Sequence, residues 1–533
     1  MKKQKMDVQV LSMEPNTNSE GRVVAFIDIG TNSIRLLLVR INPNGSYQSL
    51  TKQKETVRLG DKEFIDKILQ PDAMERAVIV CKKLMELARA YGAEEVISVA
   101  TSATRDAINK VQFLEMLKKE ANLDVCTISG TEEARLIYLG VSSGLRLGYS
   151  KALFIDIGGG STELSVGDQM QYYFLDSLNL GAVRLTNMFI PDDTGPISEE
   201  QYEQIKLYVR SQAINAIKEL SKYRVCCAVG SSGTIENLAR IAFVYLHKTT
   251  YENYEKLEYE DLKKIVKVMC SLSLEERRNF PGINSHRADI IIAGAAIIET
   301  LMSELKLSKI MVSKLGLREG LFVDYISKSE FSYMITQMSV RKRSVMQLGL
   351  TCNFDEEHAH IVTNLALELY DSIQTLGIYE FRSGERELLE YGSTLHDIGT
   401  FISYDTHQTH AYHLIRESNL SGFKPEEIEI IANLAYFHRK NIPKKKHPNL
   451  TGMNKDTIKS IRILSALLRI AESLDRSHTG VISNVRFYIA ATDSLVLEIH
   501  ARRECQLEIW EIEKHKKYFK KVFGYSIQSK VII

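Results

Sequence analysis

The chain lacks a strong charge of one sign and lacks long hydrophobic runs, and each absence excludes a class of protein. Its formal net charge is +1 over 533 residues. A nearly neutral chain has no bulk attraction to nucleic acid or to a membrane surface, so any basic site has to be local. The longest apolar runs are far shorter than the ~20 residues that a membrane helix needs, and no apolar core follows the basic start, Met1–Lys5. We therefore expect a cytoplasmic protein that has neither nucleic acid nor a membrane as a partner.

Paired cysteines are also missing. The seven cysteines are scattered without a CxxC pair, which indicates reduced core residues rather than a disulfide framework or a zinc site. The apolar content of 44% and the charged content of 25% are ordinary for a globular protein. Because 533 residues are too many for one hydrophobic core, three or four domains are expected.

Against this ordinary composition, one phrase occurs twice, as Val24–Ser33 and again as Leu153–Thr162. Each copy is a short apolar run that ends in an acid, glycine and hydroxyl residues, which predicts a buried strand and a tight turn. Backbone amides in such turns bind oxyanions, phosphate above all. A related turn follows the apolar run Val225–Val229. One such loop is equally typical of an ordinary strand-to-helix turn, but three together predict a phosphate site between two similar halves, built from Gly30, Thr31, Asn32, Ser33, Gly158, Gly159, Gly160, Ser161, Thr162, Gly230, Ser231, Ser232, Gly233 and Thr234.

Strand and helix signals alternate along the first part of the chain, which predicts a doubly wound α/β architecture. From about Lys328 only helical patterns appear, as far as His478, and strand-like alternation returns in the last fifty residues. The predicted division is a flexible leader (1–21), a first lobe (22–146) completed by a return helix (316–327), a second lobe (147–315), an all-α domain (328–480) and a small α+β C-terminal region (481–533).

Six stretches, in this order, resemble the exopolyphosphatase and guanosine-pentaphosphate phosphatase family: Phe26–Asn32, Ala100–Arg105, Ile128–Gly140, Asp156–Glu163, Ala228–Thr234 and Gly316–Gly320. That family belongs to the actin, sugar-kinase and heat-shock-ATPase superfamily. The resemblance implies two actin-like, ribonuclease-H-like lobes around a cleft. The helical segment that follows resembles the HD-type third domain of the longer family members.

Two neighbouring glutamates are candidates for activating the water that attacks phosphorus. Glu132 and Glu133 open the helix at Thr131, where acids also stabilise the positive end of a helix. Helical spacing does not decide between them. In the family that the chain resembles, the catalytic glutamate is the second of the pair, so we expect the base to be Glu133. The pair also favours attack by water over the phosphoryl transfer of the superfamily's kinases.

Two arginines are expected to contact phosphate. Arg105 follows a strand and a hydroxyl-rich turn, where a guanidinium can bind two phosphate oxygens at once. It matches the family's phosphate-contacting arginine, and the alternative is a surface arginine at a helix start. The resemblance also places a substrate contact at Arg287, for which a surface ion pair with Asp289 stays open.

Three carboxylates are candidates for holding a metal. The resemblance makes Glu163 a partner carboxylate that binds water or metal. Asp156 and Asp28 end the two repeated strands, where acids of this fold often hold Mg²⁺ through water. Asp156 with Glu163 is the favoured site, whereas Asp28 serves equally well as a cap of its own turn. The implied cofactor is Mg²⁺, and the participation of a monovalent cation such as K⁺ stays open.

A second metal site is conceivable in the helical segment. His396 and Asp397 are adjacent, and imidazole together with carboxylate suits a divalent metal. An HD-type set would be completed by His358 or His360 and by Glu472 or Asp475. Glu472 stands where the resemblance leads us to expect an aspartate. We therefore expect a structural or substrate-guiding domain rather than a second catalytic centre, and keep metal-dependent hydrolysis there as a separate hypothesis.

The densest basic run, His438–His447, is either a solvated loop or a rail for a long polyanion, and we favour the rail. The sequence thus predicts a phosphoanhydride hydrolase that releases terminal orthophosphate from polyphosphate. Guanosine pentaphosphate and tetraphosphate are the other implied ligands, and the resemblance implies a homodimer. The alternative is an alarmone-binding regulatory protein with little turnover.

Overall fold

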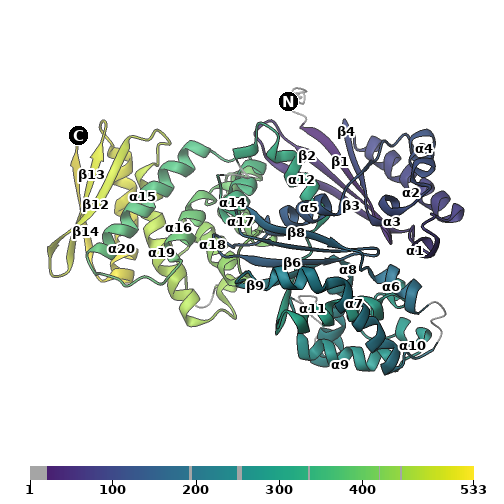
Figure 1. Ribbon diagram of the computed structural model, residues 1–533. Coiled ribbons are helices and arrows are strands. Elements are labelled where there is room, and N and C mark those ends of the chain that lie inside the picture. The colour runs from purple at the N-terminus through teal and green to yellow at the C-terminus, as the bar shows by residue number, and fades with distance from the viewer. Residues whose placement is uncertain (1–20, 191–194, 249–254, 334–336, 419, 445–446) are drawn as a thin grey trace, which may run out of the picture.

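The computed structural model describes residues 21–190, 195–248, 255–333, 337–418, 420–444 and 447–533. Nearly all of the predicted leader, residues 1–20, lies outside these ranges. Two mixed sheets lie next to each other at one end of the molecule, and a helical region separates them from a small third sheet at the C-terminus (Figure 1). Within the described ranges, no helix is both long and apolar enough to cross a membrane.

The first sheet has the strand order β3-β2-β1-β4-β5. Its central strand, β1, runs antiparallel to β2 and parallel to β4. The strands and the helices that accompany them are β1 (Arg22–Ile29), β2 (Ser33–Ile41), β3 (Tyr47–Thr56), α1 (Glu63–Asp66), α2 (Pro71–Ala90), β4 (Glu95–Ala100), α3 (Ser102–Asp106), α4 (Lys110–Ala121), β5 (Cys126–Thr127) and α5 (Gly130–Ser142).

The second sheet repeats this plan in the order β10-β11-β9-β6-β7-β8. Its strand β6 is antiparallel to β7 and parallel to β9, as β1 is to β2 and β4. Its elements are β6 (Ala152–Ile157), β7 (Thr162–Gly167), β8 (Tyr172–Leu178), α6 (Ala182–Phe189), α7 (Glu199–Leu220), β9 (Cys227–Ser231), α8 (Ser232–Ile241), η1 (Ala242–Leu246), β10 (Lys256–Glu258), α9 (Tyr259–Cys270), α10 (Leu274–Arg278), η2 (Ser285–Arg287), α11 (Ile291–Glu304) and β11 (Lys309–Val312).

Both repeated phrases therefore form a strand, a tight turn and an antiparallel return strand. In the first turn the Gly30 amide donates to the Ser33 carbonyl over 3.1 Å, and in the second the Gly158 amide donates to the Ser161 carbonyl over 2.9 Å. The expected duplication is confirmed at the level of hydrogen bonds.

Helices α5 and α12 (Leu317–Ser327) join the two sheets into one body. One hydrophobic cluster combines Phe26 of β1, Phe154 of β6, Leu136 of α5 and Phe322 of α12. The ring of Phe322 packs edge-on against that of Phe26 at 5.9 Å. Helix α12 thus returns to the first sheet after the second sheet is complete.

The C-terminal part is helical and ends in a three-stranded sheet, β12-β13-β14. One core contains residues from both, such as Leu389, Leu464, Phe487 and Phe519. The elements are α14 (Val340–Thr351), α15 (Glu356–Thr375), α16 (Glu385–Thr394), η3 (Ile398–Phe401), α17 (His407–Glu417), α18 (Pro425–Phe437), η4 (Pro448–Leu450), α19 (Lys455–Leu474), β12 (Ile482–Ala491), β13 (Ser494–Ala501), α20 (Gln506–Phe523) and β14 (Ser526–Ile532).

The α/β class with two similar sheets is confirmed, as is the helical part that follows. The domain boundaries given above and the HD-like assignment of the helical part stay predictions.

Candidate active site

The two repeated turns meet in one cleft. A Cβ atom added at Gly159, in the second turn, would lie 2.9 Å from Thr31 Cβ in the first, so only glycine permits this approach. One pocket is lined from both sides by thirteen of the predicted residues: Asp28, Gly30, Thr31, Asn32, Ser33, Glu133, Asp156, Gly158, Gly159, Gly160, Ser161, Ser232 and Arg287.

Ion pairs outside this pocket hold the lobes together. Arg184 of the second lobe contacts Asp106 of the first at 2.5 Å and donates to the Gly160 carbonyl over 2.7 Å. Arg58 pairs with Asp289 at 2.6 Å. The cleft is therefore braced by side chains that do not line it.

Hydroxyl groups of the predicted turns make hydrogen bonds in and behind the pocket lining. Ser231 Oγ donates to Asp156 Oδ2, and Ser232 Oγ donates to the Ile157 carbonyl over 2.5 Å. Thr162 Oγ1 donates to the Leu180 carbonyl over 2.5 Å. The predicted residues that do not line the pocket are Arg105, Thr162, Glu163, Gly230, Ser231, Gly233 and Thr234.

Glu133 is distinguished from Glu132 by burial and partners. Glu133 is buried and faces the pocket. Glu132 is half-buried, does not line the pocket and forms a two-contact ion pair with Arg135, at 2.7 and 2.8 Å. Of the two, Glu133 lines the pocket and Glu132 does not, so the structure distinguishes two residues that helical spacing could not.

Burial raises the pKa of Glu133 to about 7, against the opposing effect of Arg105, whose Nη1 lies 2.9 Å from Glu133 Oε2. Arg105 Nη1 also donates to the Ile128 carbonyl over 3.2 Å. This arginine therefore orients a carboxylate in addition to any contact with phosphate. A carboxyl group that titrates near neutral pH can accept a proton from water.

Three further buried carboxylates lie near the pocket, and their pKa values are raised even though arginines are close by. Burial raises the pKa values of Asp28, Asp156 and Glu163, and neighbouring carboxylates add to the effect at each. Glu163 accepts a hydrogen bond of 2.8 Å from Ser177 Oγ. A divalent cation would relieve this repulsion, so the donor set fits the metal that the sequence predicts.

Arg287 is buried and lines the pocket rather than pairing with Asp289 at the surface. The alternative of a surface ion pair is wrong, because Arg58 takes Asp289. Burial, aided by the charge of Arg35, lowers the pKa of Arg287 to about 10. A buried guanidinium beside the turns at 30–33 and 158–161 is suited to binding an anionic ligand.

Sequence reasoning missed a row of cations. Arg35 lines the pocket from β2, where it stands opposite Asp28 on β1 and Lys54 on β3. Loss of hydration, together with the charges of Arg287 and Arg35, lowers the pKa of Lys54 to about 8. The strand register would have revealed this row. The other lining residues not predicted are Thr101, Ser102, Ile137, Ile157, Ile290 and Leu317.

Comparison with known proteins gives the family. The model of the Ppx/GppA phosphatase family matches residues 38–329, and that of Ppx/GppA phosphatase, domain III, matches residues 340–516. The chain belongs to the Ppx/GppA phosphatase family. Members of this family hydrolyse phosphoanhydride bonds, so the prediction of an enzyme is confirmed and the regulatory alternative is not favoured.

Individual relatives agree with this assignment. Two proteins named guanosine-5'-triphosphate,3'-diphosphate pyrophosphatase are similar over 92% of this chain and 97% of their own length. The one from Aeromonas hydrophila subsp. hydrophila is 29% identical over 510 residues, and the one from Aeromonas salmonicida is 28% identical over 506. The solved exopolyphosphatase of Cytophaga hutchinsonii is 27% identical with a TM-score of 0.53, covering 60% of this chain and 99% of that one.

Proposed function

We propose that this phosphatase is an exopolyphosphatase that releases terminal orthophosphate from inorganic polyphosphate, and that the same cleft removes the terminal phosphate of guanosine pentaphosphate. The proposal is carried by one observation: a buried glutamate with a pKa of about 7 faces a cleft between two matching phosphate-type turns. The relatives' names supply the two substrates.

In the proposed reaction the terminal phosphate lies between the turns at Gly30–Ser33 and Gly158–Ser161. Glu133 accepts a proton from water as the water oxygen bonds to the terminal phosphorus. The anhydride P–O bond breaks, and the shortened chain leaves with the bridging oxygen. Arg105 orients Glu133, and Arg287 and Arg35 offset charge on the phosphate oxygens.

Asp156 and Glu163, with Asp28 as a weaker candidate, would hold the divalent metal, for which we propose Mg²⁺. When bound, such an ion offsets negative charge on phosphate oxygens. A homodimer and a cytoplasmic location belong to the same proposal, and light scattering tests the dimer.

The helical part supplies a basic cavity for long chains. Lys444, Lys459, Arg462 and Lys521 line one cavity of about 410 Å³ on this part of the molecule. Two residues of the predicted basic run are not available to bind a polyanion at the surface. His438 is completely buried, and Lys440 Nζ donates to the Asp405 carbonyl over 2.6 Å. Residues 445–446 of the run lie outside the described ranges.

The test is a matched pair of variants, Glu133→Gln and Glu132→Gln, assayed for phosphate release from long-chain polyphosphate and from guanosine pentaphosphate. Loss of a general base lowers kcat by about 10²–10⁴-fold, so we expect that fall for Glu133→Gln and near-normal turnover for Glu132→Gln. Circular dichroism confirms folding. Unchanged turnover of Glu133→Gln would remove this residue from the mechanism, and tight guanosine-pentaphosphate binding without phosphate release from either substrate would favour a regulator.

A further inference from the structure

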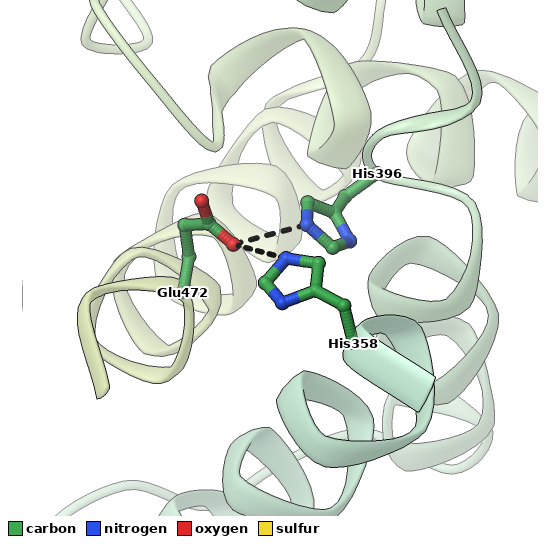
Figure 2. Close-up of side chains that lie close together, drawn as sticks. All are labelled: His358, His396 and Glu472. Atoms are coloured by element: carbon green, nitrogen blue, oxygen red, sulfur yellow. Dashed lines mark hydrogen bonds and ion pairs between the residues drawn. The ribbon is translucent and has the colours of Figure 1, made fainter. Parts of the chain in front are cut away.

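Four buried histidines converge in the helical part, far along the chain from the cleft residues. They come from four different places: His358 from α15, His396 after α16, His407 from the start of α17 and His438 after α18. All four side chains are at most 2% exposed. Figure 2 shows His358 and His396 turned toward Glu472 of α19. Burying a polar ring costs free energy unless its nitrogen atoms have partners, so the partners of these four imidazoles have to be identified.

The hydrogen bonds fix the tautomer of three of these rings. Nδ1 of His396 lies 2.6 Å from the Ser393 carbonyl, Nδ1 of His407 lies 2.7 Å from that of Tyr404, and Nδ1 of His438 lies 2.6 Å from that of Ala435. Carbonyl oxygens only accept hydrogen bonds, so each Nδ1 carries a proton. In a neutral ring, Nε2 is then a bare lone pair.

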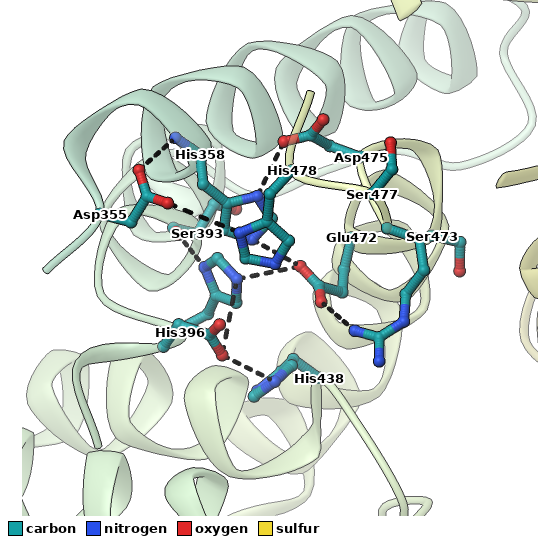
Figure 3. Close-up of polar contacts among 12 residues, drawn as sticks. Asp355, His358, Ser393, His396, His438, Glu472, Ser473, Asp475, Ser477 and His478 are labelled. Atoms are coloured by element: carbon teal, nitrogen blue, oxygen red, sulfur yellow. Dashed lines mark hydrogen bonds and ion pairs between the residues drawn. The ribbon is translucent and has the colours of Figure 1, made fainter. Parts of the chain in front are cut away.

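The fourth ring follows the same rule with a carboxylate as acceptor. Nδ1 of His358 lies 2.8 Å from Asp475 Oδ2 (Figure 3). This arrangement, in which Nδ1 donates to an oxygen and Nε2 points inward, is the one that metal-ligating histidines use. Asp475 thus supports His358, whereas Glu472 faces its Nε2.

When the rings are neutral, the inward-facing atoms all carry lone pairs, and they lie close together. Nε2 of His407 and Nε2 of His438 are 3.1 Å apart. Glu472 Oε2 lies 3.1 Å from Nε2 of His358 and 3.0 Å from Nε2 of His396. Lone pairs that face each other repel, so each pair has to share either a proton or a metal cation.

Asp397 lies between the His407–His438 pair and the set formed by His358, His396 and Glu472. Its Oδ1 is 3.1 Å from Nε2 of His407, 3.3 Å from Nε2 of His438 and 3.8 Å from Nε2 of His396. Within the described part of the chain, this buried oxygen has no hydrogen bond of acceptable geometry. It is therefore placed to bridge.

We propose that the helical part binds two divalent transition-metal ions. One ion is held by His358, His396 and Glu472, the other by His407 and His438, and Asp397 lies between them. Each three-residue set, His358–His396–Glu472 and Asp397–His407–His438, has its ligand atoms within 4.8 Å of one another. Around a tetrahedral ion with bonds of about 2.1 Å, neighbouring ligands lie about 3.4 Å apart, close to these separations.

The ligand chemistry selects the metal class. Imidazole-rich sets suit Zn²⁺, Fe²⁺ or Ni²⁺, whereas Mg²⁺ prefers oxygen ligands. The site therefore differs in metal from the carboxylate set of the cleft, and it stands whether or not the proposed cleft reaction is correct. The proposal adds bound metal to the structural or substrate-guiding role that the sequence predicts for the helical part.

The test measures bound metal rather than activity. Full-length protein is stripped with a chelator, dialysed against Zn²⁺ in excess Mg²⁺, and analysed for zinc by mass spectrometry, with affinity from calorimetry. We expect about two Zn²⁺ per chain, with the loss of at least one in His396→Ala. The matched control is His360→Ala, since His360 is an exposed residue on the same helix as His358 and contacts only Asn364 among the hydrogen bonds observed.

Two outcomes would overturn the proposal. Wild-type protein that binds no zinc would show that the rings share protons instead, as imidazolium–carboxylate pairs. Equal zinc content in His396→Ala and His360→Ala would place the ions elsewhere. Should His396→Ala fail to fold, X-ray absorption of the zinc-loaded wild-type protein decides, because the proposal requires nitrogen-rich coordination at the zinc and an all-oxygen shell contradicts it.

Discussion

At the scale of the residue, the cleft is dominated by charges that the folded chain holds in unfavourable surroundings. Glu133, Asp156 and Glu163 are buried acids with raised pKa values, and Arg287 is a buried base with a lowered one. Perturbations of this kind are concentrated at functional sites. Two predictions follow from shifted pKa values near the cleft, one for Lys54 and one for Glu163.

The first prediction concerns Lys54. Its pKa of about 8 means that its charge is present at pH 6.5 and lost as the pH rises past 8. Lys54→Gln should raise KM for polyphosphate about twofold to fivefold at pH 6.5, because it removes a partly screened positive charge near Arg35 and Arg287 that is worth about 0.5–1 kcal/mol. The ratio of variant to wild-type KM should approach one at pH 9.5.

Lys54→Arg is the matched control, since arginine stays charged throughout. Its KM should match the wild type at pH 6.5 and fall below it at pH 9.5. A Lys54→Gln effect that is independent of pH would contradict the assigned titration.

The second prediction concerns stability. The folded-state pKa of Glu163 lies above its unfolded value of about 4.5, so the folded state binds the proton more tightly. The stabilisation from this proton is complete at low pH and disappears as the pH rises through the folded pKa. Glu163→Gln should therefore melt higher than the wild type at pH 8.5, by a few degrees at about 2–4 °C per kcal/mol, with a smaller difference at pH 5.5.

Differential scanning calorimetry at both pH values measures this effect. Glu115→Gln, at an exposed position on α4, should leave the melting temperature unchanged. A difference for Glu163→Gln that shrinks with rising pH would mean that the carboxylate is stabilised, not strained, in the folded protein.

At the scale of the element, the crossing of α5 and α12 fixes the position of the base. A Cβ atom at Gly320 would lie 1.9 Å from the Leu136 carbonyl oxygen, and one at Gly140 would lie 2.1 Å from the Gly316 carbonyl oxygen. Both clashes are with backbone, which cannot rotate away. The helices are therefore as close as they can be, and Glu133 sits on one of them.

We expect Gly320→Ala to destabilise the protein by about 1–3 kcal/mol, the usual effect of overpacking, and to lower kcat because α5 must move. Urea unfolding followed by circular dichroism measures the first effect. Gly316→Ala is the control on stability, since the nearest atom to its Cβ is Asp156 Oδ2 at 4.0 Å. Equal stability of the two variants would show that the crossing can relax freely.

Local patterns were enough to predict the strands, the turns and the α/β class, because each depends on neighbours in sequence. Pairings across the fold were not visible. Arg35 and Lys54 were missed because their row exists only once β1, β2 and β3 are in register. Glu133 was chosen over Glu132 by resemblance to the family, because the sequence does not show which of the two side chains is buried.

The helical part was harder still to predict. His407 was not singled out, and His438 appeared only as the first residue of a basic run, because its burial depends on the packing of α17 against α18. His360, kept open as an alternative to His358, is exposed.

At the scale of the whole molecule, the basic cavity of the helical part predicts a salt dependence that differs between substrates. Each lysine that contacts a polyanion adds to the slope of log affinity against log salt. KM for long polyphosphate should rise steeply between 50 and 200 mM salt, about 10-fold or more. KM for guanosine pentaphosphate, which is too short to reach beyond the cleft, should change much less.

The triple variant Lys444→Ala, Lys459→Ala, Lys521→Ala should flatten the slope for long polyphosphate only. Lys516→Ala, on the same helix as Lys521 but paired with Glu513, is the control. If the triple variant and the wild type have the same slope, long polyphosphate is bound at another part of the molecule.

The position of α12 also bears on how the chain is made. Its aromatic residues Phe322 and Tyr325 pack on Phe26 at 5.9 and 5.8 Å, yet they leave the ribosome long after β1 does. At about 5–20 residues per second, this delay is on the order of 15–60 s. During that time the nascent first sheet has an apolar face that only later residues can cover. Folding of the N-terminal lobe during translation must therefore wait for the lobe that follows it.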